Sequence, residues 1–402
     1  MGLAKNDLIE REERGYGHCE KEVCKDCVGN KSLQKYISAN GHMSICNYCG
    51  KRRKVVTVED LLEPIMVGIR FEYDNADDYY CDGELPRCFD TYDLIHEKIA
   101  DDLQIYNDEL LDDISNTIDN VNWCTVDPYG DKKYEVELYS WHSFCKLVKE
   151  QIRYVFYKSK NVYEANDLSN PVNILETVAE YVQGLKLVGR IHVNQKIYRG
   201  RTHDRENELV NASDFGPPPT KAAKANRMSA EGISMFYASY DKETTLMEIE
   251  CSDEYATVAS FKIARPLTVV DFSRLKKRKL PSIFDEENRG KRASLIFLKS
   301  FAEDLSKQII DTPTIEYIPT QIVTEYFRYV FSSEEFGDID GIVYNSAKNE
   351  NGYCVALFMN ENDFERDEKC MVDKKSFKLF HYRKEYVQQN GPFADDILMM
   401  LS

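Results

Sequence analysis

Two Cys-x₂-Cys pairs near the start of the chain constrain its folding more than any other feature. Cys24 and Cys27 form the first pair, and Cys46 and Cys49 form the second after an interval of eighteen residues. This spacing is typical of a zinc site in which each pair turns tightly and directs two thiolates at one tetrahedral ion. The sequence therefore predicts a zinc-bound module over residues 1–62. Because four sulfur ligands leave no open position for water, we expect a structural zinc.

Two alternatives to this zinc site stay open from the sequence. The four cysteines can remain reduced without a metal, or Cys19, His18 or His42 can replace one of the thiolates. Gly29 and Gly50 follow the two pairs, and glycine suits the tight turns that such pairs need. The seven other cysteines are scattered along the chain and are interpreted as ordinary residues.

Length and composition predict several folded domains and exclude some partners. The chain has 402 residues, more than a single hydrophobic core usually serves, and 43% of them are apolar. The net charge of −17 argues against general attraction to nucleic acid or to an anionic membrane. The sequence has no apolar run of about 18 residues and no signal-peptide pattern at its start. We therefore expect a cytoplasmic protein that neither spans a membrane nor binds nucleic acid.

The hydrophobic pattern changes near residue 189. Residues 63–188 carry apolar side chains at helical spacing, for example over 139–157 and 173–185. Short β-branched and aromatic runs follow, separated by helical stretches, and they predict an α+β domain over 189–402. The strand candidates are the runs QKIYRGR, SMFYAS, ATVASFKI, LTVVDF, GIVYNS and GYCVALF. The expected fold class is thus multidomain: a small zinc-bound N-terminal module, an α-helical middle region over 63–188 and a C-terminal α+β domain.

Five residues of the C-terminal part form the candidate chemical site. Arg227 precedes a glycine turn and an apolar run ending at Tyr237, and Glu248 follows eleven residues later. Arg199 lies upstream in IYRGR, and Ser346 lies downstream in DGIVYNS. Arginine offers a fixed fork of donors for phosphate oxygens, and an aromatic ring can stack on a flat cation. A carboxylate can stabilise a developing positive charge or hold a hydroxyl group.

These segments resemble the RES domain, a family named for an arginine, a glutamate and a serine. The resemblance extends from about Gln195 to Phe358. Its matching stretches are YRGR, the proline segment leading into RMSAEGISMFYAS, TTLMEI, IPTQIVTEYF and DGIVYNS. The family implies a fold similar to that of ADP-ribosyltransferases and a toxin of RES–Xre toxin–antitoxin type that degrades NAD⁺ at its nicotinamide–ribose bond. It also implies the active-site set Arg199, Arg227, Tyr237, Glu248 and Ser346, in which all but Arg199 are catalytic and all but Glu248 hold NAD⁺.

Each of these five residues also has an ordinary interpretation. Arg227 can be a solvated surface residue, and Arg199 can be a salt-bridge partner at a strand end. Tyr237 can belong to the core, Glu248 can face solvent, and Ser346 can be a turn residue. The order and spacing of the five together favour the active-site interpretation.

A second glutamate offers a competing detail. Glu248-Ile249-Glu250 resembles the paired glutamates of arginine-specific ADP-ribosyltransferases. Asp241 can cap a helix, so we interpret 242–251 as helical. Residues two apart on a helix lie about 200° apart around its axis, and the two carboxylates would then point in different directions. We therefore expect Glu248 to act alone.

The order of segments in the N-terminal half also resembles a known arrangement. Cysteine pairs, helices and a RES-like domain in this order resemble an N-terminal HEPN-type region joined to a RES domain. Active HEPN ribonucleases carry Arg-x₄₋₆-His on a helix, whereas Arg11-x₆-His18 lies beside the cysteines, so we do not expect ribonuclease activity.

The function of the C-terminal domain keeps several alternatives. The ADP-ribosyl acceptor can be water, phosphate or a protein side chain, and a nucleotide-binding module without turnover is the other alternative. An antitoxin or regulatory protein and a second copy of the chain are the candidate partners.

Overall fold

A computed structural model of the chain describes residues 11, 13–80, 86–130, 132–158, 173–206, 208–249, 254–307 and 314–383. It divides into two compact units, which are residues 1–133 with 279–293 and residues 134–278 with 294–402. The boundaries expected from sequence, at residues 62 and 188, both fall inside these units. The helical middle region expected over 63–188 is therefore shared between the units.

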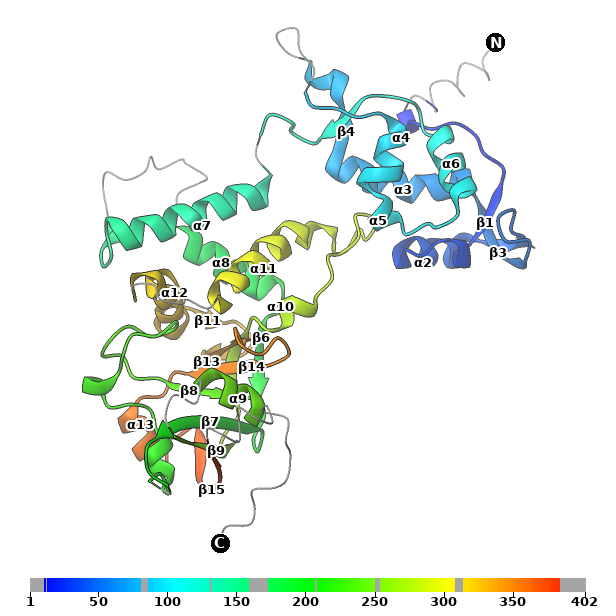
Figure 1. The fold of residues 1–402 in the computed structure, drawn as a ribbon. Helices are drawn as coiled ribbons and strands as arrows, with labels where there is room; N and C mark the ends of the chain where they lie inside the picture. Colours follow the sequence, from blue (N-terminus) through cyan, green and yellow to red (C-terminus); the bar gives the residue numbers. More distant parts are fainter. Residues whose placement is uncertain are drawn as a thin grey trace, which may run out of the picture. The chain divides into compact units, whose positions relative to one another are not determined.

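The first unit combines a small antiparallel sheet with helices (Figure 1). In its three-stranded sheet β3 lies between β1 and β2. Its strands and helices are β1 (Glu22–Cys24), α2 (Lys31–Asn40), β2 (His42–Ile45), β3 (Arg52–Thr57), α3 (Val58–Glu72), β4 (Tyr73–Asn75), α4 (Thr91–Asp93), a π-helical turn (Leu94–Lys98), α5 (Ala100–Leu103), α6 (Asp108–Thr117) and β5 (Trp123–Thr125). The π-helical turn separates α4 from α5.

Helix α3 shows how the sequence starts the helical part of this unit. The Thr57 hydroxyl accepts a hydrogen bond from the backbone N–H of Asp60 and so caps the first turn. Glu59 and Asp60 place negative charge in that turn, where the helix dipole favours it. The buried face of α3 carries Leu61, Ile65 and other apolar residues at helical spacing.

A short segment of the C-terminal sequence completes the core of this first unit. Residues 279–293 lie in the first unit, and Ile283 and Phe284 are buried there. The Phe284 ring contacts α3 so closely that a Cβ at Gly68 would lie 2.3 Å from its Cδ1 atom, which explains the glycine. Arg292 forms ion pairs with Glu72 at 2.7 Å and with Asp102 at 3.3 Å.

The second unit is built on an eight-stranded mixed sheet with the order β15-β9-β7-β8-β14-β13-β10-β6. β10 and β13 are parallel, and the other neighbouring strands are antiparallel. The strands are β6 (Val188–Ile191), β7 (Lys196–His203), β8 (Phe236–Ser239), β9 (Tyr255–Ile263), β10 (Leu267–Asp271), β13 (Gly341–Asn345), β14 (Tyr353–Leu357) and β15 (Val372–Arg383), with β11 (Ser332–Ser333) and β12 (Gly337–Asp338) in a separate pair. All six strand runs expected from sequence are strands.

Helices pack a large aromatic core onto one face of this sheet (Figure 1). Each of the helices α7, α8, α11 and α12 contributes buried side chains to this core. Examples are Phe144, Val178, Phe301 and Phe327, in that order, and Ile342 of β13 belongs to the same core. The helices of the unit are α7 (Lys133–Glu150), α8 (Ile174–Gly184), α9 (Lys242–Ile249), α10 (Arg274–Lys277), α11 (Arg292–Ser306), α12 (Ile318–Tyr329) and α13 (Glu361–Glu365). The alternate residues of β8, β13 and β14 face a second core on the other side of the sheet. None of the helices in the described part of the chain has the length and apolar content to span a bilayer.

Candidate active site and cysteine cluster

The candidate active site lies where two neighbouring strands of the eight-stranded sheet separate. β7 and β8 pair at one position in the described chain, where Tyr198 lies opposite Ser239. A hollow of about 380 Å³ is lined by residues of both strands, of α9 and of the loop between β7 and β8. Four of the five residues expected from sequence line this hollow: Arg199, Arg227, Tyr237 and Glu248. Segments that are far apart in the sequence therefore meet at one site.

Arg227 lies on a tight turn that α12 holds from behind. Asn226 and Ser229 form an antiparallel bridge, with Arg227 between them. The buried side chain of Gln321 donates hydrogen bonds to the carbonyls of Asn226 and Ser229, at 2.8 and 3.1 Å. The hydroxyl of Thr320 donates to the carbonyl of Arg227 at 2.5 Å. The IPTQ segment thus fixes the backbone that presents the Arg227 guanidinium.

Arg199 bridges the two separating strands. Its Nη1 donates to the carbonyl of Tyr237 at 2.6 Å, and its guanidinium carbon lies 4.8 Å from the centre of the Phe236 ring. Its Nε is buried and has no hydrogen-bond partner among the described residues. Burial and the neighbouring Arg201 lower the pKa of Arg199. A buried cation with an N–H group to spare is suited to an anionic ligand.

Tyr237 presents a neutral phenol to the hollow. Its hydroxyl is 2.9 Å from the Ser229 hydroxyl, so the ring is tied to the turn that carries Arg227. Burial raises the pKa of Tyr237 to about 12. The phenol therefore stays protonated at neutral pH.

Glu248 is positioned by the helix that carries it and by two hydrogen-bond donors. Asp241 caps α9 by accepting from the backbone N–H of Thr244 at 2.7 Å, as the sequence predicts. The Ser346 hydroxyl donates to Glu248 Oε1 at 2.5 Å, and the Cys354 thiol lies 3.7 Å from the same oxygen. Burial, followed by the Glu248 charge, raises the pKa of Cys354 to about 12, so this thiol is a neutral donor. Both contacts use one carboxylate oxygen.

Ser346 takes a different place from the other four expected residues. It is not among the residues that line the hollow in the described chain. Its hydroxyl oxygen accepts from the backbone N–H groups of Lys348 and Asn349, at 3.1 and 3.0 Å, while the hydroxyl donates to Glu248. The geometry therefore links Ser346 to the carboxylate and not to the space beside it. The second acidic residue, Glu250, lies outside the described residues.

In the first unit, the four paired cysteines form one compact cluster. The sulfur atoms of Cys24, Cys27, Cys46 and Cys49 all lie within 4.8 Å of one another. The Cys24–Cys27, Cys24–Cys49 and Cys27–Cys46 sulfur distances are 3.8, 3.7 and 3.7 Å. A tetrahedral zinc with bonds of about 2.3 Å requires sulfur atoms about 3.8 Å apart. The four cysteines therefore fit a zinc ion.

The two histidines considered as substitutes for a thiolate contact carboxylates instead. His18 lies 2.9 Å from a Glu59 oxygen, and His42 lies 2.8 Å from a Glu22 oxygen. Gly50 has φ of +67°, as expected for a glycine turn after the second pair. Gly29 instead allows a close approach of the Gln104 backbone, because a Cβ at this position would lie 2.5 Å from the carbonyl oxygen of Gln104.

Comparison with known families agrees with the two resemblances. Residues 196–379 match the RES domain. The C-terminal part of the chain is a RES domain. Residues 39–162 match HEPN/RES N-terminal domain 1, so the RES domain follows an HEPN-like region. No curated protein and no solved structure matches the chain.

The RES domain contains all five expected site residues, whereas the HEPN/RES N-terminal domain contains only part of the cysteine cluster. Its match begins within α2 and includes Cys46 and Cys49 but not the first pair. Arg11 and His18 also precede it, and each is held by a different carboxylate, Asp119 and Glu59 respectively.

The RES domain site also contains residues that the sequence reasoning missed. Tyr344 and Cys354 line the hollow from β13 and β14, and Lys224 lines it from the loop before Arg227. The Arg227 guanidinium carbon lies 5.8 Å from the centre of the Tyr344 ring. Buried tyrosines and cysteines in strands are usually core residues, so only their positions next to Arg227 and Glu248 reveal them. Gln321 had a signal in the IPTQIVTEYF stretch, where a polar residue occupies the buried face of a helix.

Proposed function

We propose that the RES domain cleaves the nicotinamide–ribose bond of NAD⁺ and thereby depletes it, as a toxin-like enzyme. The observation that carries the proposal is that Arg199, Arg227, Tyr237 and Glu248, from different segments, line one hollow. Two cations, an aromatic ring and a carboxylate correspond to the pyrophosphate, the nicotinamide ring and the ribose of this substrate.

Binding of NAD⁺ would use the cationic part of the hollow. Arg227 is partly buried on a fixed turn, and Lys224 lies nearby on the same wall, so both can contact the pyrophosphate. Arg199 donates to the carbonyl of Tyr237 and has a buried N–H that bonds to none of the described residues, so a phosphate or ribose oxygen can accept from it. The Tyr237 ring can stack on the nicotinamide, which is a flat cation before cleavage.

Cleavage would depend on Glu248. When the bond between the ribose carbon and the nicotinamide nitrogen breaks, its electron pair leaves with nicotinamide and the ribose becomes an oxocarbenium-like cation. Because Ser346 and Cys354 both contact Oε1, we assign stabilisation of this cation to Oε2 of Glu248. Water then adds its oxygen to the ribose and releases a proton, or phosphate adds directly. The products are nicotinamide with ADP-ribose or with its phosphate ester.

A fold, a cellular location, a partner and a metal ion are proposed for this enzyme as well. We propose that the RES domain shares the fold of ADP-ribosyltransferases, that the enzyme acts in the cytoplasm, and that an antitoxin or regulatory protein restrains it. The cysteine cluster is proposed to hold one structural zinc, because four thiolates at tetrahedral spacing occupy every coordination position.

Release of nicotinamide from NAD⁺ by the purified full-length chain tests the proposal. We expect stoichiometric nicotinamide, with the label of adenine-labelled NAD⁺ recovered in free ADP-ribose or its phosphate ester. Label retained on protein would instead identify a protein ADP-ribosyltransferase. Saturable NAD⁺ binding without any nicotinamide release would overturn the enzymatic proposal and leave a nucleotide-binding module.

A further inference from the structure

A second and larger hollow lies in the same unit as the RES domain site. Its volume is about 790 Å³, within the range of about 300–1,000 Å³ that small-molecule sites occupy. Its walls come from α8, α12, the segment 153–157 and the loop that contains residues 225, 230 and 231. Its apolar lining residues include Leu175, Ile315, Ile318 and Ile322.

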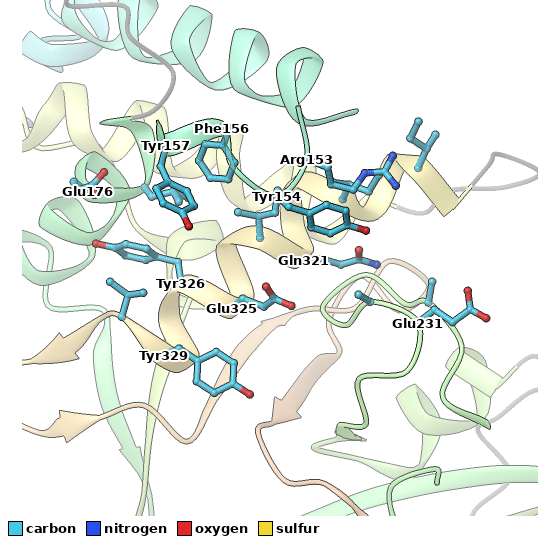
Figure 2. Close-up of a pocket in the computed structure, with 17 residues that line it drawn as sticks. Arg153, Tyr154, Phe156, Tyr157, Glu176, Glu231, Gln321, Glu325, Tyr326 and Tyr329 are labelled. Atoms are coloured by element: carbon cyan, nitrogen blue, oxygen red, sulfur yellow. The ribbon is translucent and has the colours of Figure 1, made fainter. Parts of the chain in front are cut away.

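Four tyrosines line this hollow. Tyr154, Tyr157, Tyr326 and Tyr329 all line it (Figure 2). Tyr154 is 82% exposed and Tyr329 is 70% exposed, so these rings are not core residues. Aromatic faces that surround a hollow attract cations through the negative charge of the ring face.

The charges of the hollow favour a cation as well. Glu176, Glu231 and Glu325 line it, against one positively charged residue, Arg153. No ion pair of these three carboxylates occurs within the described residues. Figure 2 shows Glu325 between the tyrosines, with Tyr157 and Tyr326 on one side of it. Burial raises the pKa of Glu325, and the charge of Arg328 opposes this shift.

This hollow shares a wall with the RES domain site. Ala225, Ala230 and Glu231 line the larger hollow, while residues 226, 227 and 229 of the same loop line the smaller one. Gln321 also lines the larger hollow, and its side chain holds the turn that presents Arg227. A ligand that displaces Gln321 or this loop therefore changes the position of the Arg227 guanidinium.

We propose that the larger hollow binds a small organic cation with an aromatic or aliphatic body, and that its occupancy changes the affinity of the RES domain site for NAD⁺. The rings and the apolar lining residues hold the body, and the carboxylates hold the charge. The first part stands without the proposed function, whereas the effect on NAD⁺ rests on it.

Direct binding tests the first part, with phenyltrimethylammonium as the probe and isothermal titration calorimetry of the full-length chain as the measurement. We expect saturable binding of this cation, and much weaker binding of benzenesulfonate, an anion of similar size, and of tert-butylbenzene, its neutral isostere. Absence of saturable cation binding, or equal binding of all three compounds, would overturn the site.

Three variants locate the binding. Tyr154→Ala and Tyr329→Ala should each weaken binding about twofold to fivefold, because each removes one exposed ring. Glu325→Gln should weaken it about tenfold, because it removes a half-buried charge at constant shape. Tyr139→Ala, at a tyrosine that is 65% exposed on α7 outside the hollow, is the matched control and should bind as the unaltered chain does. Binding unchanged in all three variants would place the cation elsewhere.

The second part is tested by titrating NAD⁺ with and without saturating phenyltrimethylammonium. We expect at least a twofold change in the KM for nicotinamide release, and in Glu325→Gln we expect the same change only at about tenfold higher probe concentrations. If the chain releases no nicotinamide, the same comparison uses the Kd for NAD⁺, so failure of the proposed function stays distinguishable. Probe binding with unchanged NAD⁺ affinity would overturn the coupling.

Discussion

The cysteine cluster of the first unit and the hollow of the second bring four chemically active residues together in opposite ways. The cluster takes Cys24, Cys27, Cys46 and Cys49 from one short stretch, and their sulfur atoms face one another at tetrahedral distances. The hollow takes its residues from a strand, a turn, a second strand and a helix, and they face an open space.

A metal site with every coordination position filled can stabilise the fold, whereas a hollow with open space can bind a substrate. In the zinc-bound state that we propose for the cluster, four thiolates would fill every coordination position, so the free energy of metal binding would become free energy of folding. In the hollow, by contrast, other residues hold the active groups from behind: Gln321 and Thr320 hold the Arg227 turn, and Ser346 holds Glu248. The front of each group is left for a ligand.

The largest expected effect follows from opening the closed site. Cys46→Ser should abolish stoichiometric zinc and unfold the cysteine-bearing part of the first unit, because structural zinc contributes about 10 kcal/mol in small domains. Metal analysis and hydrogen exchange measure the two effects. Cys88→Ser, at an exposed cysteine outside the cluster, is the control and should retain the metal. If the chain purified under reducing conditions contains no zinc, the proposed closed metal site is wrong and its contrast with the open hollow fails.

Next in size is the loss of the carboxylate in the open site. Glu248→Gln should lower the rate of nicotinamide release about 10²–10³-fold at an unchanged Tm, because it removes charge at constant shape. Glu243→Gln, on the same helix but outside the hollow, should keep the rate. Turnover near the original rate in Glu248→Gln would show that the catalytic carboxylate is misassigned.

A smaller effect should come from the residue behind that carboxylate. Ser346→Ala removes the hydroxyl that donates to Glu248 at 2.5 Å, and a hydrogen bond to a charged group contributes about 1.5–3 kcal/mol. We expect kcat to fall about tenfold to hundredfold with little change in KM, and Ser346→Thr to recover part of the loss. A rise in KM alone would instead assign Ser346 to substrate binding.

The smallest effect should come from Tyr237→Phe, which keeps the ring but removes the hydroxyl bonded to Ser229. Loss of one neutral hydrogen bond corresponds to about 1 kcal/mol, so kcat/KM should fall about fivefold. Because burial raises the pKa of Tyr237 to about 12, the phenol does not titrate near neutrality. The variant and the unaltered chain should therefore show the same dependence of rate on pH near neutrality. Loss of a pH-dependent rise or fall of the rate in the variant would contradict this.

The same comparison explains what the sequence predicted. The cysteine spacing is local, so it specified all four members of the cluster directly. The Asp241 cap and the helix that carries Glu248 were likewise readable from neighbouring residues, and α9 covers Lys242–Ile249. Strand runs with β-branched and aromatic residues were found where expected.

Features that depend on distant residues were not predictable. Tyr344 and Cys354 have apolar strand neighbours, and only the register of β13 with β14 brings them to Glu248 and Arg227. β15 was missed because only its first residue, Val372, is buried, so the strand lacks an alternation of buried and exposed positions. The active-site roles of the five residues stay predictions until turnover is measured.

The docking of Ile283 and Phe284 in the first unit limits how this chain can be divided. A fragment that starts at residue 134 would carry both side chains without the core that covers them, and would expose apolar surface that favours aggregation. The complementary N-terminal fragment would lack the ring against Gly68 and the Arg292 guanidinium that neutralises Glu72. Recombination or engineering that exchanges one unit must therefore carry residues 279–293 with the N-terminal part, although they are encoded within the RES domain.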